Sequence, residues 1–144
     1  PQTYVYLSYD PYTYTNVRLD AETMNNGSND NAISLFCRYQ DGVGWYEFNI
    51  TSGGMWNIMR YDEPDNNFVK LYDGGSYSIN MGKGQANTFS LVCSGNQISA
   101  YINNRLVRTV SDNSYADGQV GISASSFDSG DALVGFDWVS VSEP

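Results

Sequence analysis

The sequence predicts an all-β protein, a two-sheet antiparallel β-sandwich, and three observations carry that prediction. Short runs alternate apolar and polar residues with a period of two, the pattern of strands that bury one face. Clusters of Gly, Asn, Asp and Ser separate these runs, as turns do. No stretch of the 144 residues shows a helical period or low complexity. Many short strands joined by turns in one chain are typical of a sandwich.

The first half of the chain contains six expected strands. Asp10-Pro11 ends the first of them, because proline lacks the N–H that a strand ladder needs. The third strand places Ile33 and Cys37 on one face and Phe36 and Arg38 on the other. The expected strands cover residues 4–9, 15–23, 32–40, 45–51, 55–62 and 68–72.

The second half has the clearest β pattern. A short strand over residues 77–80 precedes a three-stranded meander, whose tight turns are rich in Gly and Asn, residues that tolerate positive φ. Polar loops at 112–118 and 128–131 then lead into the last two strands. The expected strands here cover residues 87–94, 97–103, 106–110, 119–125 and 133–142.

Composition and charge limit the class of partner. The formal net charge is −9, with few Lys and Arg and no His. This balance argues against a nucleic-acid partner and against anionic membrane surfaces, because both are bound through basic residues. No apolar run approaches membrane-spanning length. We expect residues 1–144 to form a single domain, excised from a longer extracellular chain.

The two cysteines, Cys37 and Cys93, lie on the apolar faces of expected strands. One interpretation is two separate buried thiols, which behave as small apolar side chains. The interpretation that we favour is a disulfide between neighbouring strands, because a surface rich in Tyr, Asn and Ser and poor in Lys suggests an oxidising exterior. Cysteine spacing alone does not show that the two residues are close.

Blocks of residues along the chain carry a resemblance to a known family. They comprise the meander, the strand after it, the closing strand and an upstream block: Asn87, Phe89, Leu91, Cys93, Gly95, Asn96, Ile98, Tyr101 and Asn103; Val110, Asp112, Tyr115, Gly118, Val120, Gly121 and Ile122; Val134, Phe136, Asp137, Val139 and Val141; and Arg38 to Asp41 with Tyr46, Phe48 and Ile50. From about Val17 onward the chain resembles the concanavalin A-like, laminin G-like jelly roll of bacterial extracellular proteins. The resemblance implies that fold and an extracellular or cell-surface location. It implies less about function, because this sandwich hosts lectins, carbohydrate-binding modules, glycosidases and adhesive domains.

An enzymatic role has little support in the sequence. The absence of His removes the usual serine, cysteine and metal-hydrolase sites. Glycoside hydrolysis needs two carboxyl groups. Hydrolases with the jelly-roll fold that this chain resembles carry Glu-x-Asp-x-Glu on one strand of the concave sheet. At that kind of position this chain has Glu47 alone, followed by Phe48 and Asn49. We therefore expect no catalytic residues.

Carbohydrate binding is the favoured function. Aromatic rings cover the C–H faces of sugars, and planar polar groups pair with hydroxyls. We expect one sheet face to carry such residues, with Trp45 stacking on the sugar and with Arg38 and Glu47 as donor and acceptor. The expected ligand-binding residues are Arg38, Gln40, Trp45, Glu47, Asn57 and Tyr61.

Two alternatives to this binding site remain open. Arg38 and Glu47 are equally well interpreted as a surface cross-strand pair, with Trp45 covering a sheet end. The chain is alternatively a structural or adhesive extracellular domain, in a filament, a surface layer or a protein–protein interaction, in which an apolar patch or an incomplete sheet edge meets protein.

A bound metal ion and a covalent modification also remain open. A structural Ca²⁺ between loops would use carboxylates, but none of them lies in a recognised metal loop and no ligands are assigned. The acidic residues in question are Asp112, Asp117, Asp128, Asp131 and Asp137. N-glycosylation triplets begin at Asn26 and Asn49, a pattern that arises readily by chance in an Asn-rich chain.

Overall fold

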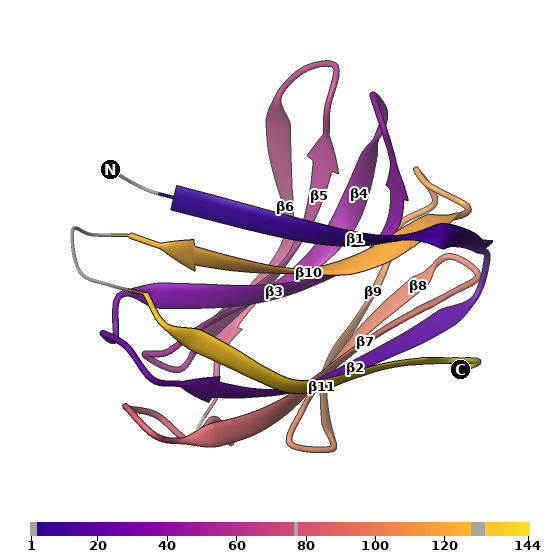
Figure 1. Ribbon diagram of the computed structural model, residues 1–144. Coiled ribbons are helices and arrows are strands. Elements are labelled where there is room, and N and C mark those ends of the chain that lie inside the picture. The colour runs from indigo at the N-terminus through magenta and orange to yellow at the C-terminus, as the bar shows by residue number, and fades with distance from the viewer. Residues whose placement is uncertain (1–2, 77, 128–131) are drawn as a thin grey trace.

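A computed structural model describes residues 3–76, 78–127 and 132–144 as two antiparallel sheets packed face to face (Figure 1). The six-stranded sheet has the order β1 (Thr3–Tyr14), β10 (Gly118–Ser126), β3 (Asn31–Gln40), β4 (Gly44–Thr51), β5 (Met55–Asp62) and β6 (Asn67–Gly75). The five-stranded sheet has the order β11 (Val134–Ser142), β2 (Val17–Asn25), β7 (Ala86–Ser94), β8 (Gln97–Ile102) and β9 (Arg105–Ser111). The predicted all-β sandwich is confirmed. Over the described ranges, no helix is long and apolar enough to cross a membrane.

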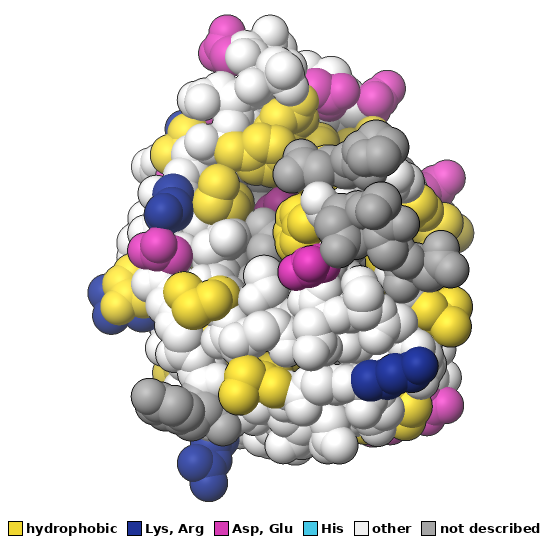
Figure 2. Space-filling model, turned by 90° about the vertical axis from the view of Figure 1, so that its left-hand side faces the viewer, with side chains coloured by type: hydrophobic (Ala, Val, Ile, Leu, Met, Phe, Trp, Pro, Cys, Tyr) yellow, Lys and Arg dark blue, Asp and Glu magenta, His cyan; other side chains and the backbone are white. Residues whose placement is uncertain are grey.

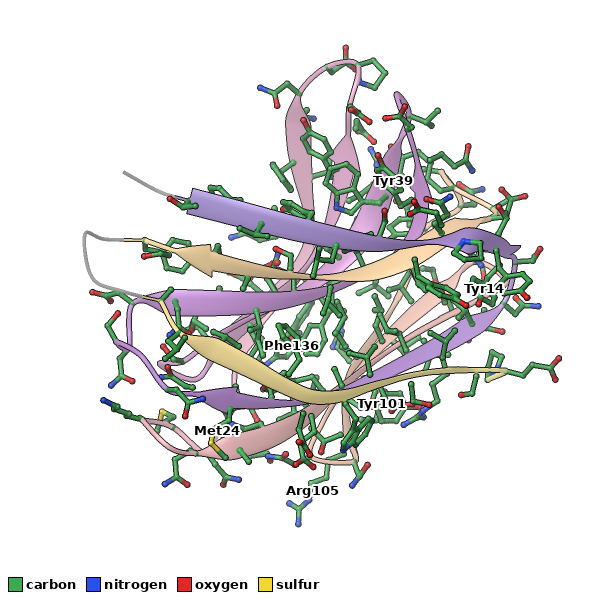
Figure 3. The ribbon with its side chains drawn as sticks, viewed as in Figure 1. Tyr14, Met24, Tyr39, Tyr101, Arg105 and Phe136 are labelled. Atoms are coloured by element: carbon green, nitrogen blue, oxygen red, sulfur yellow. A yellow bond between two sulfur atoms is a disulfide. The ribbon has the colours of Figure 1, made fainter. Side chains whose placement is uncertain are left out.

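The core lies between the two sheets and follows the period-two pattern. Each inner strand contributes alternate apolar side chains that are almost fully buried, among them Leu35 and Phe48 from the first sheet and Leu91 and Ile98 from the second. In Figure 3, Phe136 of β11 points between the sheets, whereas Arg105 of β9 points to solvent. Burying one such large apolar side chain stabilises the fold by about 1.5–3 kcal/mol. The alternation in the sequence therefore decides which face of each strand meets the other sheet.

A disulfide joins the two sheets across this core. Cys37 of β3 and Cys93 of β7 are bonded, with a Cα–Cα distance of 6.7 Å, and both side chains are fully buried. The predicted bond is confirmed, but it connects strands of opposite sheets, whereas neighbouring strands were expected. The bond can cross the sandwich because both cysteines lie on the buried inner face of their strands.

The structure corrects the expected end of the first strand. β1 continues through Pro11 to Tyr14, although its continuous pairing with β10 covers only Thr3 to Tyr9. Proline is tolerated here because β1 is the edge strand of its sheet, so the missing N–H faces no partner strand.

The expected strand at residues 77–80 is also wrong for its described part. Ser78 and Ile79 form a turn and a bend, Asn80 is irregular, and Tyr77 lies outside the described residues. The backbone of Asn80 is hydrogen-bonded by a side chain and not by a neighbouring strand. Asn87 Oδ1 accepts from the Asn80 N–H at 2.7 Å, and Asn87 Nδ2 donates to the Asn80 carbonyl at 2.9 Å. Ile79 is buried, which accounts for the apolar pattern without a strand.

Candidate functional site

The outer face of the six-stranded sheet is hollowed into a trough of about 430 Å³. Its shape follows from the sizes of side chains that lie side by side across the strands. One row runs across β1, β10, β3, β4 and β5 and consists of Tyr6, Ser123, Ser34, Asn49 and Asn57. The next row consists of Tyr4, Ser125, Ala32 and Thr51. Small residues in the central strands therefore form the floor, and tall tyrosines of β1 form one side.

Aromatic rings form the rest of the wall. Trp45, Tyr61 and Phe68 are direct neighbours on β4, β5 and β6. The ring centroids of Trp45 and Tyr61 are 4.3 Å apart, and those of Tyr61 and Phe68 are 4.4 Å apart. The Tyr6 ring meets the edge of the Trp45 ring at 5.7 Å. Tyr6 is 39% exposed and Phe68 is 47% exposed, so part of this aromatic surface faces solvent.

Glu47 anchors the hydrogen bonds of the trough. It is 4% exposed and accepts from Trp45 Nε1 at 2.8 Å, from Asn49 Nδ2 at 2.7 Å and from the Tyr6 hydroxyl at 3.4 Å. Asn49 Nδ2 also donates to Asn57 Oδ1 at 2.9 Å, and the Ser34 hydroxyl donates to Asn49 Oδ1. Burial raises the pKa of Glu47, and the hydrogen bonds from Trp45, Asn49 and Tyr6 oppose that rise. The network fixes the wall and the floor relative to each other before any ligand arrives.

Four of the six residues expected at the site line this trough: Trp45, Glu47, Asn57 and Tyr61. Arg38 does not, because a β-bulge reverses its direction. The ladders on both sides of β3 shift register around it, and its φ is 55°. Its side chain is 1% exposed and donates to the Tyr115 carbonyl at 2.8 Å and the Thr15 carbonyl at 3.0 Å. The expected role of Arg38 as a donor to the ligand is therefore corrected to a structural one.

Gln40 also lies away from the trough, beyond the same bulge at the end of β3. Its Nε2 donates to the carbonyl of Asp117 at 2.6 Å and to Asp117 Oδ1 at 3.1 Å. The alternative of an Arg38–Glu47 surface pair is also wrong, because the hydrogen bonds of these two side chains go to other partners.

Several residues of the trough were absent from the expected set. They are Tyr4, Tyr6, Ala32, Ser34, Asn49, Thr51, Met59, Phe68, Ser125 and Phe127. Alternating tyrosines at the start of the chain are visible in the sequence, but nothing in it shows that this strand pairs with β10 and lies along the site. Asn49 carries a signal, since it shares the outward face of its strand with Glu47.

The acidic residues considered for Ca²⁺ are dispersed. Asp112 accepts from Tyr46, Arg60 and Ser114, while Asp117 accepts from Gln40. Asp137 is exposed on β11, and the other two acidic residues considered, Asp128 and Asp131, lie outside the described residues. Among the residues that the structure describes, no group of three or more His, Cys, Asp or Glu side chains is arranged to hold a metal ion. Structural Ca²⁺ stays an untested alternative.

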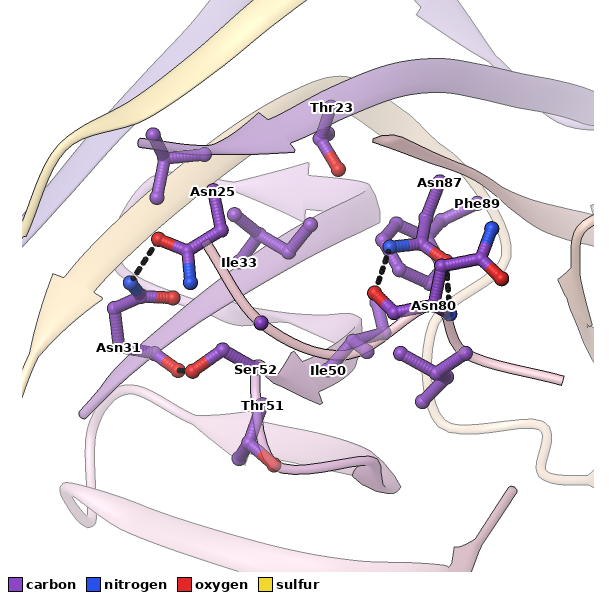
Figure 4. A pocket seen from close by; sticks show the side chains of 13 residues that line it. Thr23, Asn25, Asn31, Ile33, Ile50, Thr51, Ser52, Asn80, Asn87 and Phe89 are labelled. Atoms are coloured by element: carbon purple, nitrogen blue, oxygen red, sulfur yellow. Dashed lines mark hydrogen bonds between the residues drawn. The ribbon is translucent and has the colours of Figure 1, made fainter. Parts of the chain in front are cut away.

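A second cavity, of about 30 Å³, lies between the two sheets near their polar end (Figure 4). Asn25, Asn31, Asn80 and Asn87 are among the residues that line it. Asn31 Nδ2 donates to Asn25 Oδ1 at 3.0 Å, and Asn87 Nδ2 donates to the Asn80 carbonyl at 2.9 Å. This volume is comparable to that of one water molecule. The cavity is too small for a sugar, whereas the outer trough has the volume and the aromatic and polar lining that a sugar would need.

Comparisons with known proteins identify the fold. No protein-family model and no curated protein matches the sequence. The structure is similar to the carbohydrate binding module CBM66 from Bacillus subtilis, with a TM-score of 0.74 and 14% identity over 93% of this chain and 78% of the other. It is also similar to a tetrameric galectin from the ball sponge Cinachyrella sp., with a TM-score of 0.71 and 8% identity over 96% of this chain and 98% of the other. A third similar structure is galectin LEC-6 from Caenorhabditis elegans, with a TM-score of 0.68 and 16% identity over 99% of this chain and 93% of the other. At these identities the likeness shows the fold alone: the chain has the concanavalin A-like jelly-roll fold of lectin-like domains.

Proposed function

We propose that this chain is a non-catalytic carbohydrate-binding module that holds a glycan in the outer trough of its six-stranded sheet. The observation that carries the proposal is an aromatic wall beside a floor of amide and hydroxyl groups. Sugars present the same two surfaces, apolar C–H faces and hydroxyl groups. The shared fold with a carbohydrate binding module and galectins supports the proposal.

The trough offers complementary contacts to a sugar ring. The half-buried rings of Trp45 and Tyr61 and the more exposed ring of Tyr6 can cover a C–H face. The Asn57 amide adds donors to ligand hydroxyls, because its Oδ1 already accepts from Asn49. One stacking contact is worth about 1–3 kcal/mol if it resembles base–aromatic stacking. The expected dissociation constants are micromolar to millimolar in order of magnitude.

Catalysis is not part of the proposal. Among the described residues that line the trough, Glu47 is the only carboxylate. Glycosidases need a second carboxyl group across the scissile bond, at about 5–9.5 Å from the first. The disulfide supports an extracellular or cell-surface location, because such bonds persist in oxidising compartments.

The test is a glycan array followed by calorimetry on the best ligands, with Trp45→Ala and Trp138→Ala compared in parallel. Trp138 is the matched control: it lies on β11 of the other sheet and is 41% exposed. Trp45→Ala should abolish binding while circular dichroism shows a folded protein, and Trp138→Ala should bind as the wild type does. An array without any bound glycan, or full binding by Trp45→Ala, would contradict the proposal.

A structural or adhesive role is the second candidate, and an open sheet edge favours it. β1 and β11 are edge strands of the two sheets, and an apolar groove of about 470 Å³ runs between them. Leu7 is 62% exposed there and Val139 is 44% exposed. Residues 3–9 carry no charge and no proline, so this edge lacks the usual protection against pairing. A second copy of the chain that pairs its own β1 antiparallel would extend the sheet by a twofold axis.

Sedimentation over a range of concentrations tests this second role. A dimer that Leu7→Lys dissociates would support it, since the charge would stand in the groove. A monomer at every concentration up to about the millimolar range of weak complexes would exclude pairing between copies.

A further inference from the structure

The trough has a one-sided charge. Among the described residues that line it, Glu47 carries the only formal charge, and no Lys or Arg is present. The whole chain adds to this bias with a net charge of −9. Figure 2 shows one side of the molecule, where hydrophobic side chains gather in the upper half and Lys and Arg side chains are few and scattered.

Two cations on strands of the six-stranded sheet, Arg38 and Lys70, have partners outside the trough. Arg38 turns away at the bulge and donates to backbone carbonyls of Tyr115 and Thr15. Lys70 neighbours Met59 across β5 and β6, but its Nζ lies 3.0 Å from Asp73 Oδ2. An anionic ligand group in the trough would therefore find no cation among the described lining residues, and it would face the Glu47 carboxylate.

The hydrogen bonds around Glu47 suit its ionised form. Trp45 Nε1 and Asn49 Nδ2 only donate, and each already points at one of the two carboxylate oxygens. The third contact comes from the Tyr6 hydroxyl. A carboxylate accepts all three bonds without rearrangement, so the network favours the charged form and opposes the burial that raises the pKa of Glu47.

Aromatic rings surround this charge. Tyr6 and Trp45 contact Glu47 directly, and the Tyr61 ring lies against the Trp45 ring. Ring faces attract cations, and the attraction grows where water is excluded. A ligand ammonium group would meet attractive partners on the wall, whereas a ligand carboxylate or sulfate would meet repulsion and lose its hydration.

We propose, on the basis of the proposed function, that the trough selects glycans by charge: it prefers sugars with a free amino group, accepts neutral sugars and rejects uronic acids and sulfated or sialylated sugars. Glu47 is the residue that determines this preference. For a ligand cation the Glu47 carboxylate and its aromatic neighbours are attractive. For a ligand anion the same carboxylate is repulsive, and no cation among the described lining residues offsets it.

The test uses two matched series of oligosaccharides, one with the gluco and one with the galacto configuration. Within each series the hexose, the 2-amino-2-deoxyhexose and the hexuronic acid differ by one substituent. Calorimetry at about pH 7, where an amine of this kind still carries much of its proton, should rank amino sugar, neutral sugar and uronic acid in that order. We expect a ratio of at least about tenfold in dissociation constant between amino sugar and uronic acid.

Three variants separate the local charge from the global one. Glu47→Gln should bring the affinities of a series to within about twofold of one another in a protein that calorimetric unfolding shows to be folded. Glu22→Gln removes the same charge from β2 of the other sheet and should leave the ranking unchanged. Met59→Lys places a cation beside Glu47 on the adjacent strand and should reverse the preference toward the uronic acid.

The outcomes distinguish the two proposals. Uronic acids that bind the wild type as tightly as amino sugars, or a ranking that survives both Glu47→Gln and Met59→Lys, would overturn the charge selection and leave glycan binding intact. Absence of binding by every sugar in both series would overturn the proposed function, and the charge selection with it.

Discussion

Loss of the disulfide should cost this protein a large part of its stability. The bond between Cys37 and Cys93 closes a segment with a sequence separation of 56 residues. In the chain-entropy model, a cross-link over a loop of this size stabilises the folded state by about 4 kcal/mol. A folded domain of ordinary stability has about 5–15 kcal/mol in total, so the reduced protein should be marginal.

The assay is urea unfolding at 25 °C of the oxidised protein, the reduced protein and the double variant Cys37→Ala/Cys93→Ala. Reduction removes the cross-link and keeps both side chains, whereas the double variant also removes buried sulfur atoms from the core. We therefore expect stability to fall from oxidised to reduced protein and to fall further in the variant. A difference of less than about 1 kcal/mol between oxidised and reduced protein would refute the assignment of this stabilisation to the cross-link.

Three further predictions test other parts of the structure. Hydrogen bonds from Arg60 lower the pKa of Asp62; burial alone would raise the pKa of Asp112, but bonds from Tyr46, Ser114 and Arg60 outweigh it and lower that pKa too. Because both acids have depressed pKa values in the folded state, their contribution to the free energy of unfolding is complete above the unfolded pKa of about 4 and is lost as the pH falls below it. The urea midpoint should therefore drop below that pH in the wild type, and it should drop much less in Arg60→Met. Arg38→Met should destabilise the fold by about 2 kcal/mol or more, since two carbonyls lose their donor. Calorimetry at a temperature where the variant is folded should nevertheless find glycan binding within about twofold of the wild type. A selective loss of binding would restore Arg38 as a ligand residue. Gly121→Ala should lower the thermal midpoint of unfolding clearly more than Gly135→Ala. A Cβ at position 121 would lie 2.2 Å from the Leu7 carbonyl oxygen, whereas a Cβ at position 135 would lie 3.3 Å from the movable Asn26 amide. Equal midpoints would show that β1 can move away.

The sequence by itself determined the class of fold and much of the chemistry of the candidate site. A period of two is a local property, so it placed most of the strands and divided inner from outer faces without knowledge of the partners. The pattern groups Trp45 with Glu47 and Asn57 with Tyr61, and it places Cys37 and Cys93 on apolar faces. The family resemblance, which puts Tyr46, Phe48 and Ile50 inward, assigns Trp45 and Glu47 to the outer face, where the structure has them.

Tertiary structure decided the rest, because it depends on partners that are distant in the chain. The bulge at Arg38 exists only between β4 and β10, and it moved the one expected cation out of the trough. The wall formed by Tyr4 and Tyr6 requires β1 to pair with β10, more than 100 residues later. Alternation fixes the two faces of a strand, whereas register, bulges and strand order arise from packing and backbone pairing between strands.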